Sequence, residues 1–329
     1  MRQINLANIS RTTLKLVLSR FTLLCICLHV YGNGYSQLSV LKNVQQNRFT
    51  GKAYIKNEMY DSAYLAISKF VENEIYANPY DYLNYSLCNY KIKDTFNFQK
   101  YLTKAVEGGV DSGTVKNYLR KLTGNDKIFL DNYLNLNYEQ LRKKGWLKYD
   151  TVLINEVNSI ERLDQYARNE FAKLVAAKTD SNYKYLGYLQ KQADSINYVR
   201  VASLFGSGKF PGYHNCGAFA SLMIILIHLG DNQEDQWQFL YDELKTEVLA
   251  GNIMPLEVAT ITDNHFQRGR GKLCSYYGQW TGRTTELCDC KNVDNYRAII
   301  GLEDLQSEYK ANGKTLQECY ESKSAPGKK

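Results

Sequence analysis

Apolar residues spaced three and four apart constrain the fold of this chain more than any other feature of its sequence. The longest series lies on one face of a predicted helix and comprises Val152, Leu153, Val157, Ile160, Leu163, Ala167, Phe171 and Leu174. This spacing follows the helical period of about 3.6 residues. The pattern stays helical from residue 149 onward, so the sequence predicts an all-α fold with one short strand-like or irregular excursion.

The length and apolar content of the chain suggest two folded parts. A domain usually takes roughly 100–200 residues, and the chain has 329. Because 44% of the residues are hydrophobic, a core can form and wholesale disorder is excluded. The count of 4 prolines excludes collagen-like and proline-rich classes as well.

The first 36 residues have the order of a secretory signal peptide. They contain no acidic residue, and their basic residues are Arg2, Arg11, Lys15 and Arg20. The apolar run Phe21–Val30 is shorter than the roughly 20 residues needed to cross a bilayer. Gly34 and Ser36 then fit a cleavage site before Gln37. We predict a signal peptide over residues 1–36 and an exported protein, periplasmic or extracellular, with an amphipathic first helix as the alternative.

Cleavage would lower the formal net charge from +7 to +3, because four positive charges leave with the signal peptide. Part of the remainder lies in a basic tail over residues 313–329. Nucleic-acid binding normally needs a clustered basic face, so we exclude it as the main role. No later segment reaches membrane-spanning length without charges, and we expect no membrane span after cleavage.

Six cysteines remain after cleavage: Cys88, Cys216, Cys274, Cys288, Cys290 and Cys319. An even number in an oxidising compartment is compatible with disulfides, and Cys274, Cys288 and Cys290 lie close enough in sequence to staple a loop. Free thiols or a metal site stay open, but Cys288 and Cys290 have no second well-spaced pair. We predict neither a metal nor a cofactor.

Two segments in the N-terminal third align on each other, residues 51–63 and residues 86–98, with an offset of 35 residues. The first copy has a small Gly51, an aromatic Tyr54, and a small Ala63 where two helices would cross. Closely packed helices need a small side chain at the crossing and an aromatic ring beside it. The offset is near the roughly 34 residues of a tetratricopeptide repeat, which the first copy resembles.

The second copy departs from that pattern with Phe98 where alanine is usual. Residues 111–146 add a divergent third helix pair, and we predict tetratricopeptide-like repeats over residues 37–148. The resemblance implies a groove for a peptide or protein partner. With so few repeats, we favour a packing scaffold for a helical domain over residues 149–312.

Further elements of this C-terminal domain follow from apolar spacing and from the positions of glycine and proline. We predict helices over residues 182–205, 216–229, 232–250, 255–266 and 294–310. A loop covers residues 206–212, and the aromatic-rich residues 273–280 are predicted to be extended.

Short sequence motifs of the same domain occur in a characteristic order. They are Asp164, Gln165, Arg168, Phe210–Gly212, Gly217, His228, Thr262, Asp263, Tyr276, Gln279, Asp294, Arg297, Gly301 and Leu302. In this order, residues 150–310 resemble an uncharacterised bacterial domain, domain-of-unknown-function family 6624, whose members often carry tetratricopeptide-like helices upstream. The chain departs from the family at Ile227 and Asn264, where the family has Gln and Arg, and within residues 276–279. The resemblance implies no reaction.

His228 closes a strongly apolar predicted helix, where a charged imidazole would be costly to bury. Two interpretations stay open. One is a neutral, hydrogen-bonded core residue or helix cap, and the other is a general base in a pocket, oriented by Asp231 or Asp263. A metal site is disfavoured, since His214 and His265 share no ligand spacing with His228.

Seven other polar residues are candidate ligand-binding positions: Asp164, Gln165, Arg168, Tyr276, Gln279, Asp294 and Arg297. The two acid–arginine pairs stand three or four residues apart, so each either forms an ion pair on its helix or points into a cleft. Tyr276 and Gln279 either line a pocket or pack within the fold.

No nucleophile elbow, phosphate-binding loop, dinucleotide fingerprint or zinc-protease helix occurs in the sequence. We therefore expect a binding or interaction module of the cell envelope that recognises a peptide or a small polar ligand. The alternative is a hydrolase-like enzyme with His228 as general base, Asp263 as its partner, and Arg168 or Arg297 as an anion clamp. Whether the chain is an enzyme stays open.

Overall fold

The computed structural model describes residues 37–71, 76–120, 125–176, 183–229, 234–269, 274–279 and 286–311. The predicted signal peptide over residues 1–36 and the basic tail over residues 313–329 lie outside them, as do Asp231 and Cys319. Within the described ranges the chain is helical apart from turns, loops and one isolated bridge between Ser275 and Leu287. The all-α prediction is confirmed.

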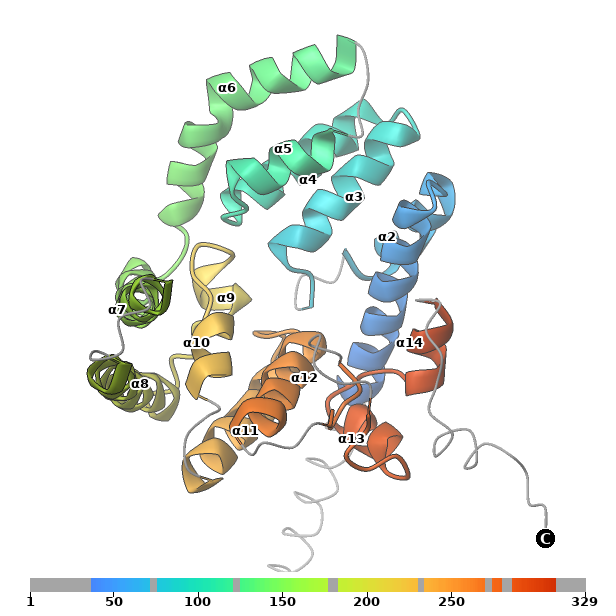
Figure 1. Cartoon of the computed structure of the whole chain (residues 1–329). Helices are drawn as coiled ribbons and strands as arrows, with labels where there is room; N and C mark the ends of the chain where they lie inside the picture. The colour runs from blue at the N-terminus through green and yellow to red at the C-terminus, as the bar shows by residue number, and fades with distance from the viewer. Residues whose placement is uncertain are drawn as a thin grey trace, which may run out of the picture.

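The N-terminal part stacks its helices largely in chain order (Figure 1). They are a helix over residues 37–56, α2 (Tyr60–Val71), α3 (Pro79–Lys91), α4 (Thr95–Glu107), α5 (Ser112–Leu119) and α6 (Asn125–Trp146). The first two pack closely at both small residues named in the repeat, since Ala63 is fully buried and a Cβ on Gly51 would lie 2.5 Å from Ile67 Cγ1. Asn78 caps α3, where its side chain accepts the Asp81 N–H and the Asp81 carboxylate accepts the Asn78 N–H.

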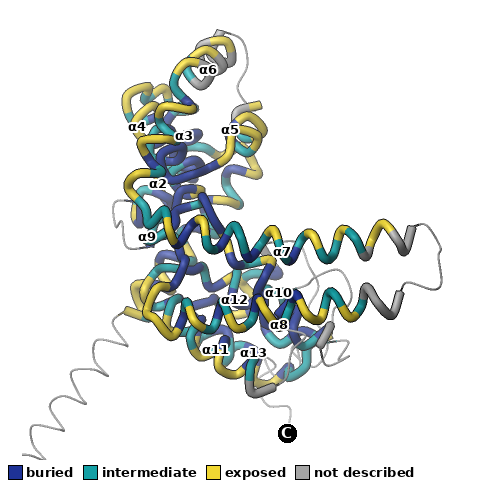
Figure 2. Tube along the Cα trace, turned by 90° about the vertical axis from the view of Figure 1, so that its left-hand side faces the viewer, coloured by how far each residue is buried: buried dark blue, intermediate teal, exposed yellow. Residues whose placement is uncertain are grey.

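The C-terminal part begins with α7 (Thr151–Ala176) and α8 (Tyr183–Gly206), which pack side by side and extend from the body in Figure 2. It continues with α9 (Tyr213–Cys216), α10 (Met223–Leu229), α11 (Glu234–Leu249), α12 (Pro255–Asn264), the π-helical turn His265–Gly269, α13 (Val293–Ile299) and α14 (Leu305–Ala311). Helix α10 packs on α7, α8 and α12, so it joins the long helix pair to the rest of this part.

Two predicted helices are wrong in extent, and a glycine explains each. The stretch over residues 216–229 is helical again only from Met223, where α10 begins. The break lies at Gly217, which has a φ of +57°. The Ala218 N–H then donates to the Gly108 carbonyl of the N-terminal part at 2.7 Å. The helix predicted over residues 294–310 divides into α13 and α14 near Gly301, whose φ is +77°. A positive φ favours glycine and ends a helix.

One contiguous core joins the two parts of the molecule. Its buried side chains extend along the chain from Leu41 to Leu302. The Tyr76 hydroxyl adds a polar link, donating to the Leu249 carbonyl at 3.3 Å. The boundary predicted at residue 148 falls in the turn between α6 and α7, but it does not separate two cores.

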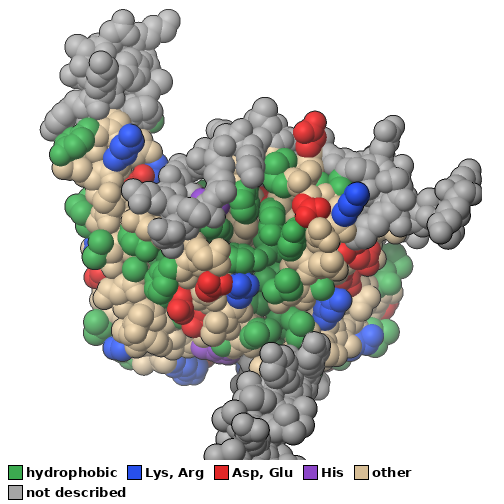
Figure 3. Space-filling model, turned by 90° about the horizontal axis from the view of Figure 1, so that it is seen from below, with side chains coloured by type: hydrophobic (Ala, Val, Ile, Leu, Met, Phe, Trp, Pro, Cys, Tyr) green, Lys and Arg blue, Asp and Glu red, His purple; other side chains and the backbone are tan. Residues whose placement is uncertain are grey.

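The molecular face seen from below mixes apolar side chains with charges of both signs (Figure 3). No extended basic face of the kind that nucleic acid needs is formed on the described residues of that side. Among the helices that the structure describes, none has the length and apolar character of a membrane span.

Candidate functional site

Four of the predicted site residues meet where α7, α8 and α10 pack together. Asp164, Gln165 and Arg168 lie on α7, and His228 lies in the last turn of α10. The Asp164 carboxylate is their common partner: it accepts hydrogen bonds from His228 Nδ1 and Gln165 Nε2 at 2.8 Å each, and from Arg168 Nε at 3.1 Å. Asp194 on α8 binds Arg168 Nη2 at 2.7 Å. We call these five residues the Asp164 cluster.

His228 turns one ring nitrogen inward and leaves the other available. Nδ1 lies 2.8 and 3.0 Å from the two Asp164 oxygens, whereas Nε2 has no hydrogen-bond partner among the described residues. The side chain is 11% exposed, and Nε2 is not one of the buried polar atoms left without a partner in that part of the chain. In a neutral ring the Nδ1 proton is donated to Asp164, and the Nε2 lone pair can accept a proton.

The Asp164 carboxylate is ionised although it is 1% exposed. Burial is the largest influence on this group and by itself would raise its pKa. The hydrogen bond from His228 and the charge of Arg168 outweigh burial and hold the pKa of Asp164 below its ordinary value. With Asp194, the cluster contains two carboxylates and one guanidinium, a formal charge of −1 when the imidazole is neutral.

Both arginines predicted as an anion clamp already pair with carboxylates. Arg168 is shared between the two acids of the Asp164 cluster. Arg297 is 1% exposed, donates to the Tyr277 and Glu303 carbonyls at 2.6 Å each, and forms an ion pair with Glu308. The predicted clamp role is therefore corrected, because these guanidinium groups hold protein elements together.

Asp263 organises the loop that follows α12. Four donors surround its fully buried carboxylate: the Tyr276 N–H at 2.5 Å, the Tyr277 N–H at 2.7 Å, the Gln279 N–H at 2.7 Å and the Ser275 hydroxyl at 2.5 Å. Burial raises the pKa of Asp263 to about 6, against the opposing effect of these donors. The prediction that Asp263 orients His228 is wrong, because Asp164 takes that position at Nδ1.

Tyr276, Gln279 and Asp294 also act inside the fold. The Tyr276 ring stacks between the rings of Phe266 and Tyr296, with centroid distances of 4.9 and 4.2 Å. Gln279 Nε2 donates to a carboxylate on α14 at 3.0 Å, and Asp294 accepts the first N–H of that helix at 3.0 Å. These predicted ligand-binding residues therefore join the loop, α13 and α14 to one another.

The predicted staple between cysteines is present. Cys274 and Cys288 form a disulfide with their Cα atoms 4.9 Å apart, and Cys290 is disulfide-bonded as well. Cys88 and Cys216 are free thiols in the core, and burial raises the pKa of each to about 12. Within the described ranges, no group of three or more His, Cys, Asp or Glu side chains is placed to hold a metal ion.

A groove lies between the N-terminal helices and the start of α12. Its middle is a cavity of about 470 Å³ whose walls include Lys52, Lys56, Tyr80 and Met254. Tyr80 also lines a cavity of about 210 Å³ on one side, and Lys52 and Met254 line one of about 80 Å³ on another. The three cavities share these lining residues, and we refer to them together as the central groove.

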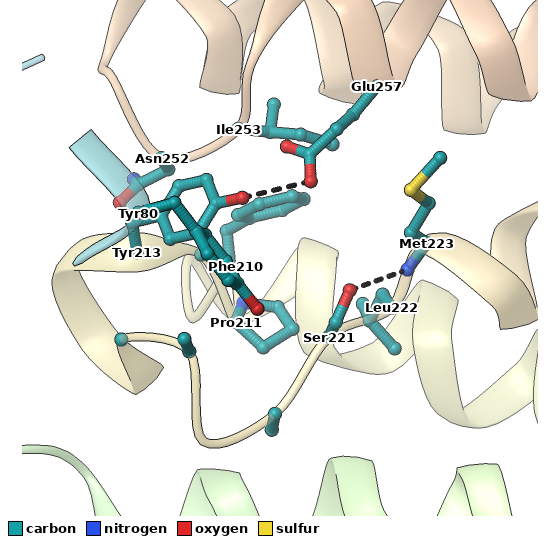
Figure 4. Close-up of a pocket in the computed structure, with 14 residues that line it drawn as sticks. Tyr80, Phe210, Pro211, Tyr213, Ser221, Leu222, Met223, Asn252, Ile253 and Glu257 are labelled. Atoms are coloured by element: carbon teal, nitrogen blue, oxygen red, sulfur yellow. Dashed lines mark hydrogen bonds between the residues drawn. The ribbon is translucent and has the colours of Figure 1, made fainter. Parts of the chain in front are cut away.

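The 210 Å³ cavity has the half-buried carboxylate of Glu257 on its wall (Figure 4). The Tyr213 hydroxyl points to Glu257 Oε1 at 2.9 Å, and Glu257 Oε2 accepts the Met254 N–H at 2.9 Å. Burial raises the pKa of Glu257, although both bonds oppose the shift. Residues 220–222 also line the cavity, and their N–H groups make no hydrogen bond within the described residues. Such groups can donate to a carbonyl or carboxylate of a ligand.

The middle of the central groove is electropositive. Lys52 and Lys56 are its charged side chains, and no Asp or Glu among the described residues lines this cavity. Both lysines reach solvent. Desolvation has the largest effect on Lys52 and lowers its pKa, so an anion bound beside the ammonium would raise that pKa again.

Sequence reasoning missed the groove lysines and Asp194. Lys52 and Lys56 stand one turn apart on a predicted helix, a spacing that indicates a shared face but not what faces it. Asp194 reaches Arg168 only because α7 and α8 pack together, and no local pattern reports that contact.

No family model, curated protein or solved structure matches this chain. The resemblances to tetratricopeptide repeats and to family 6624 therefore stay predictions.

Proposed function

We propose that this protein is a binding module of the cell envelope whose central groove holds an extended acidic peptide. The observation that carries this proposal is the pairing of Lys52 and Lys56 in a cavity with no described carboxylate on its walls. Complementary charge steers encounter and selects among partners. A carboxylate of the ligand complements the walls of this middle cavity, where a cation would be repelled. Glu257 lines one flanking cavity and Glu303 and Glu308 line the other, so the acidic residues of the peptide would lie in the middle.

The shape of the groove favours an extended chain over a compact ligand. Three cavities adjoin one another through Tyr80, Lys52 and Met254. An extended peptide rises about 3.3 Å per residue, so a short segment can follow such a path. The unpaired N–H groups of residues 220–222 supply donors for its main-chain carbonyls.

The cysteines support the export that the signal peptide predicts. The bond between Cys274 and Cys288 and the oxidised state of Cys290 fit an oxidising compartment. We therefore expect the ligand of the groove to be a peptide or a protein segment of the cell envelope.

Fluorescence anisotropy with labelled octapeptides tests the proposal. Three peptides of equal length carry Asp, Asn or Lys at the same alternate positions among alanines. We expect the Asp peptide to bind most tightly and its Kd to rise with salt, which screens exposed charges. Replacing both lysines, Lys52→Gln with Lys56→Gln, should weaken it by about 1 to 2 kcal/mol, or about 5- to 30-fold, as for two partly exposed ion pairs.

Lys191→Gln with Lys209→Gln is the matched control, because it removes the same charge from exposed positions outside the groove. This variant should keep its Kd within about twofold, the size of a general field effect. Equal binding of the Asp and Asn peptides, or equal weakening in both double variants, refutes the assignment of the groove.

A further inference from the structure

The Asp164 cluster lies apart from the central groove, since none of its five residues lines any of the three cavities. His228 is fixed from behind by a buried carboxylate, and its outer nitrogen has no hydrogen-bond partner among the described residues. The ring is thus held in one orientation, and 11% of the side chain is exposed to solvent. Asp–His pairs of this geometry set the tautomer that leaves Nε2 unprotonated.

The formal charges of the cluster favour an uncharged substrate over an anionic one. Arg168 pairs with Asp164, so this carboxylate has a cationic partner besides its hydrogen bond to His228. Asp194 then leaves a formal charge of −1 on the cluster. A negatively charged substrate would be repelled, whereas an uncharged one can approach Nε2.

We propose that His228 is a general base for hydrolysis of an uncharged carboxylic ester, with Asp164 as its positioning residue. Within the described part of the chain, no Ser, Thr or Cys hydrogen-bonds to His228, so water is the nucleophile. Nε2 takes a proton from water while the water oxygen bonds to the ester carbonyl carbon. The bond to the alcohol oxygen then breaks, and the imidazolium returns the proton to the leaving alkoxide.

Hydrolysis of 4-nitrophenyl acetate by the full chain tests this step. We expect turnover above the buffer rate, and His228→Gln should lower kcat/KM by about 100-fold, within the range of general-base catalysis. His214→Gln is the matched control, because His214 is exposed and lies outside the cluster. The anionic probe 4-nitrophenyl phosphate should be hydrolysed no faster than in buffer.

The positioning role of Asp164 predicts a separate signature. Asp164→Asn should lower kcat and leave KM unchanged, because the ring loses its orientation while the substrate keeps its contacts. Asp164→Glu should restore part of the lost kcat, which a role in folding alone would not produce.

Diethyl pyrocarbonate tests the wild-type chain without any substitution. Peptide mapping by mass spectrometry should find a carbethoxyl group on His228, with ester hydrolysis lost in parallel and recovered with hydroxylamine. An unmodified His228 in the folded chain, no turnover above buffer, or an equal loss in His214→Gln overturns the proposal.

Discussion

Asp263→Asn tests whether one buried carboxylate holds the loop after α12. The Asp263 side chain is fully buried, and its oxygens only accept: Oδ1 from two backbone N–H groups, and Oδ2 from one N–H and a hydroxyl. Asparagine has nearly the same shape, but one oxygen becomes an NH₂ group that cannot accept. Whichever oxygen is replaced, at least one backbone N–H then faces another donor.

The expected cost follows from these contacts. At pH 8, well above the pKa of about 6 for Asp263, the carboxylate is almost wholly ionised. A hydrogen bond to a charged group contributes about 1.5 to 3 kcal/mol, and a buried donor without a partner costs about 1 to 3 kcal/mol. Losing one bond and weakening the others should lower the free energy of unfolding by about 2 to 4 kcal/mol.

Urea unfolding at pH 8, followed by circular dichroism, measures this change at a constant m value. Asp242→Asn is the matched control, because the Asp242 side chain is 55% exposed. We expect the control to change stability by less than about 0.5 kcal/mol. If Asp263→Asn costs less than about 1 kcal/mol, or no more than the control, its donors find other acceptors and the carboxylate does not hold the loop.

Three further sites give independent tests by urea unfolding. Arg48→Ala should cost about 3 to 5 kcal/mol, because it leaves buried Asp81 without the guanidinium bonded at 2.6 and 2.8 Å. Gly145→Ala should cost about 1 to 3 kcal/mol, since its Cβ would lie 1.9 Å from a backbone oxygen of α4. Gly187→Ala, with nothing within 4 Å, should instead gain up to about 1 kcal/mol. The pKa of Asp164 is lowered from its ordinary value of 3.8, so its stabilising contribution is present above that value and is lost as pH falls below it. As pH falls from about 4, the wild type should therefore lose more stability than Asp164→Asn.

Helix α7 could be predicted from sequence because its apolar positions keep the helical period along most of its 26 residues. The break at Gly217 could not be predicted. An apolar run such as residues 218–227 is equally compatible with a buried helix and with a buried extended segment. The deciding contact is the hydrogen bond from Ala218 to the Gly108 carbonyl, which exists only once the two parts of the chain have packed.

In the candidate site as well, contacts between residues close in sequence could be predicted, whereas contacts between distant segments could not. The sequence places Asp164 beside Arg168, because residues four apart on a helix are neighbours, but it leaves open whether they form an ion pair or point into a cleft. The predicted partner Asp263 is wrong for His228, because the acid that binds the ring lies 64 residues away on another helix. Asp263 lies close in sequence to the aromatic loop that it organises. Sequence spacing alone, however, does not predict that four donors of this loop bind its carboxylate.

Asp164 and Asp263 are both buried carboxylates that collect several donors, yet they differ in what they leave unpaired. The donors of Asp263 come from the segment over residues 275–279 and all point inward, so the group holds a loop and presents no free atom. Asp164 instead orients an imidazole whose Nε2 has no hydrogen-bond partner among the described residues.

Two substitutions should therefore separate stability from activity. His228→Gln should lower kcat/KM for ester hydrolysis by about 100-fold while keeping most of the unfolding free energy, because a Gln amide can still donate to Asp164. Asp263→Asn should lower the unfolding free energy while the molecules that remain folded keep the activity of the Asp164 cluster.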